Sequence, residues 1–566
     1  MKQINKYNKY SVSVVLAAVL ATTAIAQTPD SGSVLREVQP PKIDTPTPEL
    51  PTLKSREYKA PISEHDSVKI YVDSFAISGN SAYSDEQLLA IVAPHANKEL
   101  SLGEIKQIAS LITRYYRDNG YFVARAYIPA QELDKESAQV EIAIIEGEYG
   151  QFQMDNSSNV NTPTVQSFMD RLTEGDVVST HSLERQMLLI NDLGGAVVTD
   201  AQIMPGKQVG TSDFIIEVSP QDRYSGYAMV DNYGSRYTGI HRLNVGAFVN
   251  SASNTGDVLA LTGLISENGN LKNARVAYDR HLGYSGLKGG VSLSYTEYEL
   301  GKELKNLEAK GQTTHFSTNL SYPLIKTRAH TLETRLSYDH KSLRDKTVAT
   351  NSKKETNSLT LALIDTFNTA WFNRYGVLTS SVSLTSGELK LKSDDARAND
   401  VGLDAKGSYS KLNAEISQLQ TITDSLYMTT SFNAQQSLNR NLDSSESFSV
   451  GGAYGVRAYK DSEQSGDKGY LASIELSYIL PTYSGISHTL STFVDHAKVW
   501  NNHDKPQGVT DNSRVLNGVG IGYSASYNDF SLNATLAHGF GPDREATADG
   551  GRADRNLLLV QGLWRF

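Results

Sequence analysis

The C-terminal part of the chain, from Tyr224 to Phe566, has the period of β-strands and no helical period. Segments of about 10–16 residues alternate apolar with small polar residues, and turns rich in Gly, Asn, Asp and Ser separate them. In one of them Val291, Leu293 and Tyr295 fall on one face, with serine and threonine on the other. Because successive residues of a strand point to opposite faces, each segment predicts a strand with one apolar face.

This alternation fits either a large soluble β-domain or a barrel in a membrane. A soluble domain turns its apolar faces inward, whereas a membrane barrel turns them to lipid and keeps a small, polar interior. Two features favour the membrane: no helical segment covers a second face, and tyrosine outnumbers phenylalanine 30 to 15, as suits rings at a wet interface. Sixteen candidate strands, from 223–232 to 555–566, predict a closed antiparallel barrel whose backbone groups are all paired.

The N-terminal residues predict export from the cytoplasm. Lys2, Lys6 and Lys9 precede an apolar run that ends in a small-x-small site before Gln27. This pattern predicts a signal peptide over 1–26. A membrane anchor is the alternative, but the run is shorter than the roughly 20 residues that a spanning helix needs.

Residues 27–66 are rich in proline and predict an extended linker. Within it, SGSVLREVQ at 31–39 predicts either two helical turns that end before Pro40 or part of a disordered tail.

Two small α+β modules are expected at 67–149 and 150–220. The first reads as strand, helix, helix, strand, strand, with capping boxes that begin at Ser84 and Ser101. Its strands include 121–129, and we expect two helices on one face of a three-stranded sheet. The second module repeats the pattern loosely, with helices near 164–172 and at 181–193.

The composition and motifs indicate no catalytic or nucleic-acid function. The chain has 63 acidic and 53 basic residues, a net charge of −10, which argues against nucleic acid as the main partner. It has no cysteine, so disulfides, thiolate zinc sites and cysteine nucleophiles are excluded. The metalloprotease HExxH, the hydrolase GxSxG and the P-loop are absent from the sequence, and the histidines lack metal-ligand spacing. We expect no enzyme activity, no cofactor and no metal.

Three glycines near the C-terminus, Gly518, Gly520 and Gly522, resemble part of a dinucleotide-binding motif. They lie within a strand pattern and precede no helix, so that interpretation is weak. We expect instead that they make room for a bulky group inside the barrel.

Several local motifs resemble those of one outer-membrane family. DNYGSRYTG at 231–239 resembles the family's first barrel hairpin, and RDNGYFVARAYIPAQ at 117–131 resembles a strand of its first periplasmic domain. VRAY at 456–459 is similar to the VRGY loop motif, with Ala458 where glycine is usual. FVDHA is similar to the FxDxG strand motif, with Ala497 in the glycine position.

The whole organisation resembles the transporters of two-partner secretion, within the outer-membrane assembly superfamily. Exporters of haemolysins, filamentous adhesins and contact-dependent inhibitors are examples. The resemblance implies a mainly β fold, with a 16-stranded antiparallel transmembrane barrel at 221–566. Two POTRA domains at 67–149 and 150–220 and a plug helix with its linker at 27–66 would precede the barrel. It also implies the cell outer membrane, with the POTRA domains in the periplasm.

The resemblance assigns site residues as well. It implies that the long loop between Asn439 and Lys468 folds back into the barrel, where Arg457 meets Asp495 on the wall. Two solvated charges in a wet pore are the alternative. The residues of this loop lock are Val456, Arg457, Tyr459, Phe493 and Asp495; the hairpin motif comprises Asp231, Asn232, Gly234 and Ser235; the plug helix contributes Val34, Leu35 and Arg36; and the partner-binding POTRA strand contributes Tyr121, Val123, Arg125 and Tyr127.

The implied partner is a large secreted β-helical exoprotein: a haemolysin, an adhesin or a contact-dependent toxin. Outer-membrane lipid and the barrel-assembly machinery are further expected partners, the latter because the final strand ends in an aromatic residue, Phe566. Nucleic acid is not expected, and the resemblance implies a monomer. The nearest alternative is an insertase of the same superfamily; a passive porin, a surface adhesin and an enzymatic barrel are weaker ones.

Overall fold

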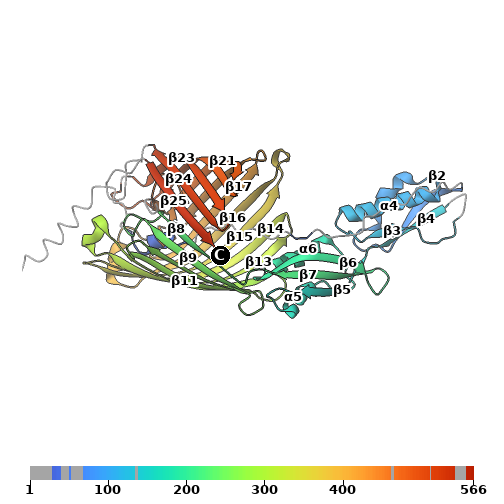
Figure 1. Cartoon of the computed structure of the whole chain (residues 1–566), viewed down its shortest axis with the longest axis horizontal. Coiled ribbons are helices and arrows are strands. Elements are labelled where there is room, and N and C mark those ends of the chain that lie inside the picture. The colour runs from blue at the N-terminus through green and yellow to red at the C-terminus, as the bar shows by residue number, and fades with distance from the viewer. Residues whose placement is uncertain are drawn as a thin grey trace, which may run out of the picture.

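The computed structural model describes residues 29–39, 50–51, 68–133, 138–460, 464–509, 511–541 and 556–566. The predicted signal peptide and most of the predicted linker lie outside these ranges. A barrel stands at one end of the molecule, one small α/β domain abuts it, and a second lies farther along (Figure 1). Among the described residues, no helix is long and apolar enough to cross a membrane.

Sixteen strands close into one antiparallel barrel, as the sequence predicts. Its seam is the pairing of the last strand with the first, from Gln561↔Asp231 to Arg565↔Tyr227. The barrel strands are β8 (Tyr224–Asp231), β9 (Arg242–Asn250), β10 (Val258–Ser266), β11 (Leu271–His281), β12 (Lys288–Glu299), β13 (Lys310–Lys326), β14 (His330–Lys346), β15 (Asn351–Thr369), β16 (Gly376–Leu391), β17 (Gly407–Thr421), β18 (Leu426–Ser437), β21 (Lys468–Tyr483), β22 (Ile486–Trp500), β23 (Ser513–Tyr527), β24 (Phe530–Phe540) and β25 (Asn556–Arg565).

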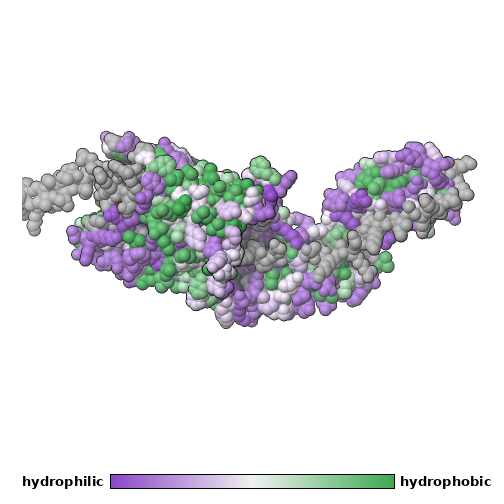
Figure 2. Space-filling model, turned by 45° about the horizontal axis from the view of Figure 1, so that its top comes forward, coloured by the Kyte–Doolittle hydropathy of each residue, from purple (hydrophilic) through white to green (hydrophobic). Residues whose placement is uncertain are grey.

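The apolar faces of the barrel strands point outward. Val291 and Leu293 are each 48% exposed, whereas Thr296 on the opposite face is buried. Hydrophobic residues gather over the middle of the barrel's outer surface, between more hydrophilic ends (Figure 2). This is the arrangement of a barrel that faces lipid outside and water inside.

The first small domain has a four-stranded sheet in the order β2-β1-β4-β3, so the three-stranded prediction was wrong. The additional strand, β2, comprises only KELS between the two helices, and four residues show no readable period. The strand expected at 121–129 is also shorter, because only Arg125–Tyr127 pairs with its neighbour. The elements are β1 (Lys69–Ser78), α3 (Asp85–Val92), the 3-10 turn η1 (Ala93–His95), β2 (Lys98–Ser101), α4 (Leu102–Asp118), β3 (Arg125–Tyr127) and β4 (Ala138–Ile145).

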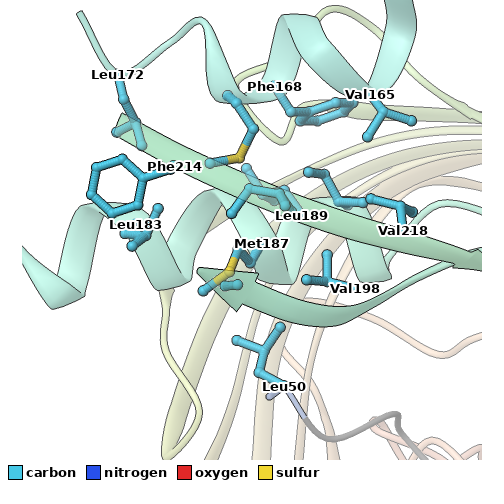
Figure 3. Close-up of a cluster of buried hydrophobic side chains, with 14 of the residues drawn as sticks. Leu50, Val165, Phe168, Leu172, Leu183, Met187, Leu189, Val198, Phe214 and Val218 are labelled. Carbon is cyan, nitrogen blue, oxygen red and sulfur yellow. The ribbon is translucent and has the colours of Figure 1, made fainter. Parts of the chain in front are cut away.

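The second small domain packs two helices against a three-stranded sheet in the order β5-β7-β6. Phe168, Met187 and Phe214 form the centre of its core (Figure 3). The elements are β5 (Glu148–Asn156), α5 (Thr162–Met169), α6 (Thr180–Asn191), β6 (Ala196–Pro205) and β7 (Thr211–Pro220).

This second domain is held to one end of the barrel by charge and by aromatic contact. The Asp192 carboxylate lies 3.0 Å from the Lys288 ammonium and 2.9 Å from that of Lys326. Burial alone would raise the pKa of Asp192, but these two ammonium groups lower it below its ordinary value. The Phe168 ring meets His281 and Tyr284 edge-on.

A short helix, α2 (Ser31–Glu37), lies inside the barrel (dark blue in Figure 1). Asp30 caps its N-terminus by accepting from the Ser33 backbone N–H at 2.9 Å. The other short elements are η2 (Lys302–Leu307), η3 (Trp371–Asn373), α7 (Asp394–Asn399), η4 (Ser444–Glu446), β19 (Phe448–Ser449) and β20 (Ser465–Gly466).

Candidate functional site in the barrel lumen

The loop between β18 and β21 carries Arg457 into the barrel. Its arms pair as the two short strands β19 and β20. Val450, Val456 and Tyr459 of the loop are buried against wall residues such as Leu516. The loop therefore packs on the inner wall and fills part of the lumen.

Arg457 donates three hydrogen bonds to Asp495 of β22. Its Nε donates to Asp495 Oδ2 at 3.0 Å, its Nη2 to Oδ1 at 2.8 Å, and its backbone N–H to Oδ2 at 3.1 Å. The Asp495 side chain is fully buried. A buried carboxylate requires a cation and hydrogen bonds, and this bidentate pair with a backbone donor supplies both.

Phe493 completes the loop lock. The guanidinium carbon of Arg457 lies 3.3 Å from the centroid of the Phe493 ring, in cation–π contact. Val494, between Phe493 and Asp495, is 52% exposed on the outer surface. Phe493 and Asp495 therefore share the inward face of β22, and Val494 lies on the outward face.

Two neighbouring wall residues were not predicted. Glu475 of β21 forms a second ion pair with Arg457, and Ser473 Oγ donates to Asp495 Oδ1 at 2.7 Å. The register pairs Ser473 with Asp495 and Glu475 with Phe493. The sequence indicates only that Glu475 is an acidic residue at an inward position of a strand whose alternate residues are apolar; its position beside Phe493 depends on the register.

Two of the three C-terminal glycines make room for bulky groups, as expected. A Cβ on Gly518 would lie 3.1 Å from Val456 Cγ1 and 3.2 Å from Ala458 Cβ of the loop. A Cβ on Gly520 would lie 2.4 Å from the Phe493 ring. Gly522 differs, because the nearest atom to its Cβ would be the hydroxyl of Ser491. The Ala458 methyl group, where the family motif has glycine, thus packs against a wall glycine.

Residues of the hairpin motif form hydrogen bonds both across the seam and with side chains that face the lumen. Asp231 accepts from Arg242 Nε at 2.8 Å and from Asn244 Nδ2 at 3.0 Å. Asn232 bridges to β25: its Nδ2 donates to Leu558 O at 2.8 Å, and its Oδ1 accepts from the Val560 N–H at 2.8 Å.

The turn of this hairpin is tight and buried. A Cβ on Gly234 would lie 2.0 Å from Gly239 O, so no larger residue fits there. Ser235 is buried, and its hydroxyl accepts from the Tyr237 N–H at 3.2 Å. The hairpin also holds the C-terminal end of α2: Thr238 Oγ1 lies 2.8 Å from Glu37 Oε2, and Arg242 Nη1 donates to Glu37 O at 2.8 Å.

The plug residues contact both the wall and the long loop. Val34 is fully buried in an apolar cluster that includes Tyr298 of β12, and Leu35 is half-buried. Arg36 Nη1 donates to Ser444 O of the loop at 2.7 Å. Contacts with the loop and with β9 and β14, which lie far apart around the barrel, show that α2 crosses the lumen.

One lysine is shared by the plug and the loop. Lys354 Nζ of β15 lies 3.3 Å from Asp30 Oδ2 and 2.7 Å from Asp443 Oδ2. In the same loop, Glu446 pairs with Lys341 at 2.7 Å and with Lys411 at 2.9 Å. Because Lys354 pairs with both segments, a shift of α2 or of the loop changes the charge that surrounds the other, so the two are electrostatically coupled.

The four POTRA residues divide into two pairs. Tyr121 packs within a cluster of tyrosine rings, and Val123 packs against the core of the second domain. Arg125 and Tyr127 are exposed on β3, at the edge of the sheet. In the described part of the chain, no group of three or more His, Cys, Asp or Glu residues is placed to hold a metal ion.

Comparison with known families matches residues 210–525 to the haemolysin secretion/activation protein family ShlB/FhaC/HecB. Residues 70–147 match the ShlB-type POTRA domain. Heme/hemopexin transporter protein HuxB of Haemophilus influenzae (strain 86-028NP) is 30% identical over 554 residues, covering 95% of this chain and 96% of HuxB.

Outer membrane transporter CdiB of Escherichia coli is 24% identical over 427 residues, covering 72% of this chain and 69% of CdiB. The solved structure of CdiB from Escherichia coli superposes with a TM-score of 0.73 at 21% identity, covering 90% of this chain and 93% of that one. The two structures therefore share one fold.

Proposed function

The chain belongs to the haemolysin secretion/activation family of ShlB, FhaC and HecB. We propose the following steps by which it exports its partner. It is a two-partner secretion transporter of the cell outer membrane, with POTRA domains in the periplasm. The observation that carries the proposed cycle is the seating of α2 in the lumen, where it is held by the wall and by the loop with Arg457.

The first step is capture of the partner's N-terminal part by the first POTRA domain. Its edge strand β3 presents exposed Arg125 and Tyr127. Between them the Ala126 N–H donates to Thr113 Oγ1 of α4 at 2.9 Å, a bond that an incoming strand replaces. An extended segment of the partner adds there as a further strand, which gives affinity through the backbone and selectivity through side chains. Tyr121 packs within the first domain and Val123 packs against the second, so both fix the segment that precedes this edge.

The second step is release of the plug. Partner binding displaces α2 from its contacts with Arg242, Lys354 and Ser444, and the loop that carries Arg457 then moves. The unfolded partner passes through the lumen as an extended chain. Folding on the far side makes return unfavourable, so direction needs no nucleotide hydrolysis.

The partner is one large exoprotein. A haemolysin, an adhesin and a contact-dependent toxin fit the family, and the relative at 30% identity is named for haem and hemopexin, so a partner that handles these is a further candidate. We propose a monomeric pore that the barrel-assembly machinery inserts into the membrane. Transport is the activity of the family, and we propose no catalysis.

The alternative within the superfamily is an insertase for other barrels. A helix seated in the lumen favours secretion over an insertase function, because a pore that can open and close lets a polypeptide chain pass through it. The test compares the culture medium of cells with and without this protein. Export predicts the loss of one very large secreted protein with normal outer-membrane composition, whereas a general loss of barrel proteins would contradict it.

A further inference from the structure

The neighbouring strands β13 to β16 are longer than the apolar part of a membrane requires. β14 begins at His330, two residues after Arg328, whose Nε donates to Glu184 of the second POTRA domain at 2.6 Å, and it ends at Lys346. Its 17 residues, at roughly 3.4 Å each and a tilt of about 40°, rise about 44 Å. The apolar band of a membrane barrel is only about 25 Å tall. Because the POTRA domains mark the periplasmic end, the ends of these strands near Lys346 stand among the headgroups of the outer leaflet.

Outward-facing side chains on these strands change from apolar to basic toward the outer leaflet. Leu336 of β14, Leu361 of β15 and Leu384 of β16 are exposed on the lipid-facing surface. The same faces lead, by alternation, to a cluster that we call the outer basic patch. It comprises Lys310, Arg344, Lys346, Lys353, Lys390 and Lys392. The whole chain has a net charge of −10, so the patch is a local reversal of sign.

Two pairs of like charges face each other directly in this patch. The strand register places Lys310 opposite Lys346, and Arg344 opposite Lys353. Glu299 of β12 lies on the other side of Lys310. Like charges directly opposite each other on neighbouring strands destabilise a sheet. An anion placed between such pairs from outside would remove that cost.

The carboxylates of β15 and β16 that face the same way are already paired. Glu388 lies 3.0 Å from Lys390, and Glu355 lies 2.7 Å from Lys392. Three cations of the patch are left without an ion pair among the described residues: Arg344, Lys346 and Lys353. The patch therefore has more positive charge than the protein itself neutralises there.

We propose that the outer basic patch binds the phosphate groups of an anionic glycolipid of the outer leaflet, whose acyl chains pack on the apolar band beside it. Lysine and arginine side chains are long and flexible enough to carry their charges to phosphates at the membrane surface. Basic residues near a membrane surface are attracted to anionic lipids. The charge selects phosphate, and the adjoining leucines select a ligand that also carries acyl chains. This inference requires only a barrel in the outer membrane, so it does not depend on the proposed export cycle.

The patch residues alternate along the strands with residues that hold the plug helix. Asp345, next to Arg344, accepts the first backbone N–H of α2 at 2.7 Å. Lys354, next to Lys353, lies 3.3 Å from Asp30, which caps α2. A glycolipid that offsets the repulsion between Arg344 and Lys353 therefore stabilises the pair of strands on which α2 rests.

The test measures lipid binding to the full-length protein in detergent by native mass spectrometry. Three probes are titrated: rough lipopolysaccharide, the same lipopolysaccharide after dephosphorylation, and phosphatidylglycerol. Rough lipopolysaccharide is expected to bind roughly tenfold more tightly than either of the others. Equal binding of the dephosphorylated probe would overturn the role of phosphate. Equal binding of phosphatidylglycerol would overturn the choice of a glycolipid.

A triple variant locates the site. Replacing Arg344, Lys346 and Lys353 with glutamine is expected to weaken binding of rough lipopolysaccharide roughly a hundredfold, at about fivefold for each cation. The matched control replaces three exposed lysines near the same end of the barrel, on β11 and η2, with glutamine: Lys272, Lys302 and Lys305.

The control variant is expected to change the affinity by less than about twofold, because it leaves every cation of the patch in place. Equal weakening in the two variants would overturn the patch as the site. Heat-modifiable migration shows whether each barrel assembles. If the patch variant fails to assemble, the comparison of the three probes on the unaltered protein still decides whether phosphate and glycolipid are recognised.

Discussion

Arg457 is the residue on which the lumen site depends most. It neutralises the fully buried Asp495, pairs with Glu475 and covers the Phe493 ring. Removing one member of a buried ion pair costs about 3–5 kcal/mol, because the remaining charge stays desolvated. The strands themselves do not depend on this pair, since their ladders close without it.

The first prediction is that Arg457→Ala sharply reduces secretion while the barrel still assembles. The measurement is the amount of partner in the medium, with heat-modifiable migration of the barrel as the assembly control. Arg457→Lys is expected to restore little, because an ammonium group lacks the planar fork that binds both oxygens of Asp495. Unchanged secretion in Arg457→Ala would remove the role assigned to the loop lock.

Glu146 gives a second prediction, in the first POTRA domain. Burial alone would raise its pKa, but hydrogen bonds from Ser81, Tyr116 and the Ala82 backbone lower the pKa below its ordinary value of 4.5. A depressed carboxyl pKa stabilises the fold above the unfolded-state value, and this contribution is lost as pH falls through the folded-state value.

Glu146→Gln is therefore expected to destabilise this domain by about 2 kcal/mol at neutral pH. Hydrogen-exchange protection of residues 69–145 in the full-length protein is the measurement. The difference between the two proteins should shrink as pH falls below 4.5. A difference that is constant from pH 7 to pH 3 would show that the carboxylate charge is not responsible.

Single residues were predictable where a motif or a strand period fixed them. The meeting of Arg457 and Asp495 follows from two motifs far apart in the sequence, and the inward face of β22 follows from alternation. Glu475 escaped, because its role depends on the register between two strands, which the sequence does not state. The contact of Val123 with the second domain was not predicted either, because contacts between domains leave no periodic pattern in the sequence.

Among the elements, the position of α2 depends on one small residue, Gly32. A Cβ on Gly32 would lie 2.3 Å from Ser444 Oγ and 2.5 Å from the Ser445 backbone nitrogen. The helix can approach the loop this closely only without a side chain there. The Ser444 hydroxyl could rotate away from an added side chain, but the Ser445 backbone nitrogen could not.

The third prediction is that Gly32→Val unseats the plug and raises conductance in planar bilayers toward the level of a protein lacking 31–39. Gln39→Ala is the matched control, since Gln39 is exposed just beyond the same helix. Secretion is expected to persist in Gly32→Val, because the pore opens more readily. Conductance no higher than in the control would show that α2 does not close the pore.

Elements were predictable in proportion to their length. All sixteen barrel strands were expected, because runs such as β15 repeat the period-two pattern many times. The strand β2 was missed and β3 was overestimated, because four and three residues cannot establish a period. Helix starts were read accurately at Ser84 and Ser101, where both capping boxes form.

In the molecule as a whole, the parts to which we assign recognition and passage are separate. The first POTRA domain contacts the second one, and the second is fixed to the barrel by Asp192 and its two lysines. The fourth prediction is that deletion of 67–150 abolishes partner binding in vitro while the barrel still conducts once 31–39 is also removed. Binding that survives this deletion would move the recognition surface elsewhere.

The central claim is that the partner crosses the membrane inside the barrel. Thr360 and Leu361 are adjacent on β15, and they test it as a matched pair. Thr360 faces the lumen, where its hydroxyl lies 2.9 Å from that of Thr385, whereas Leu361 is 54% exposed on the outer surface. A photo-crosslinking amino acid placed at each position during secretion should capture the partner from 360 and not from 361. Capture from 361 alone, or from neither while secretion continues, would contradict the account.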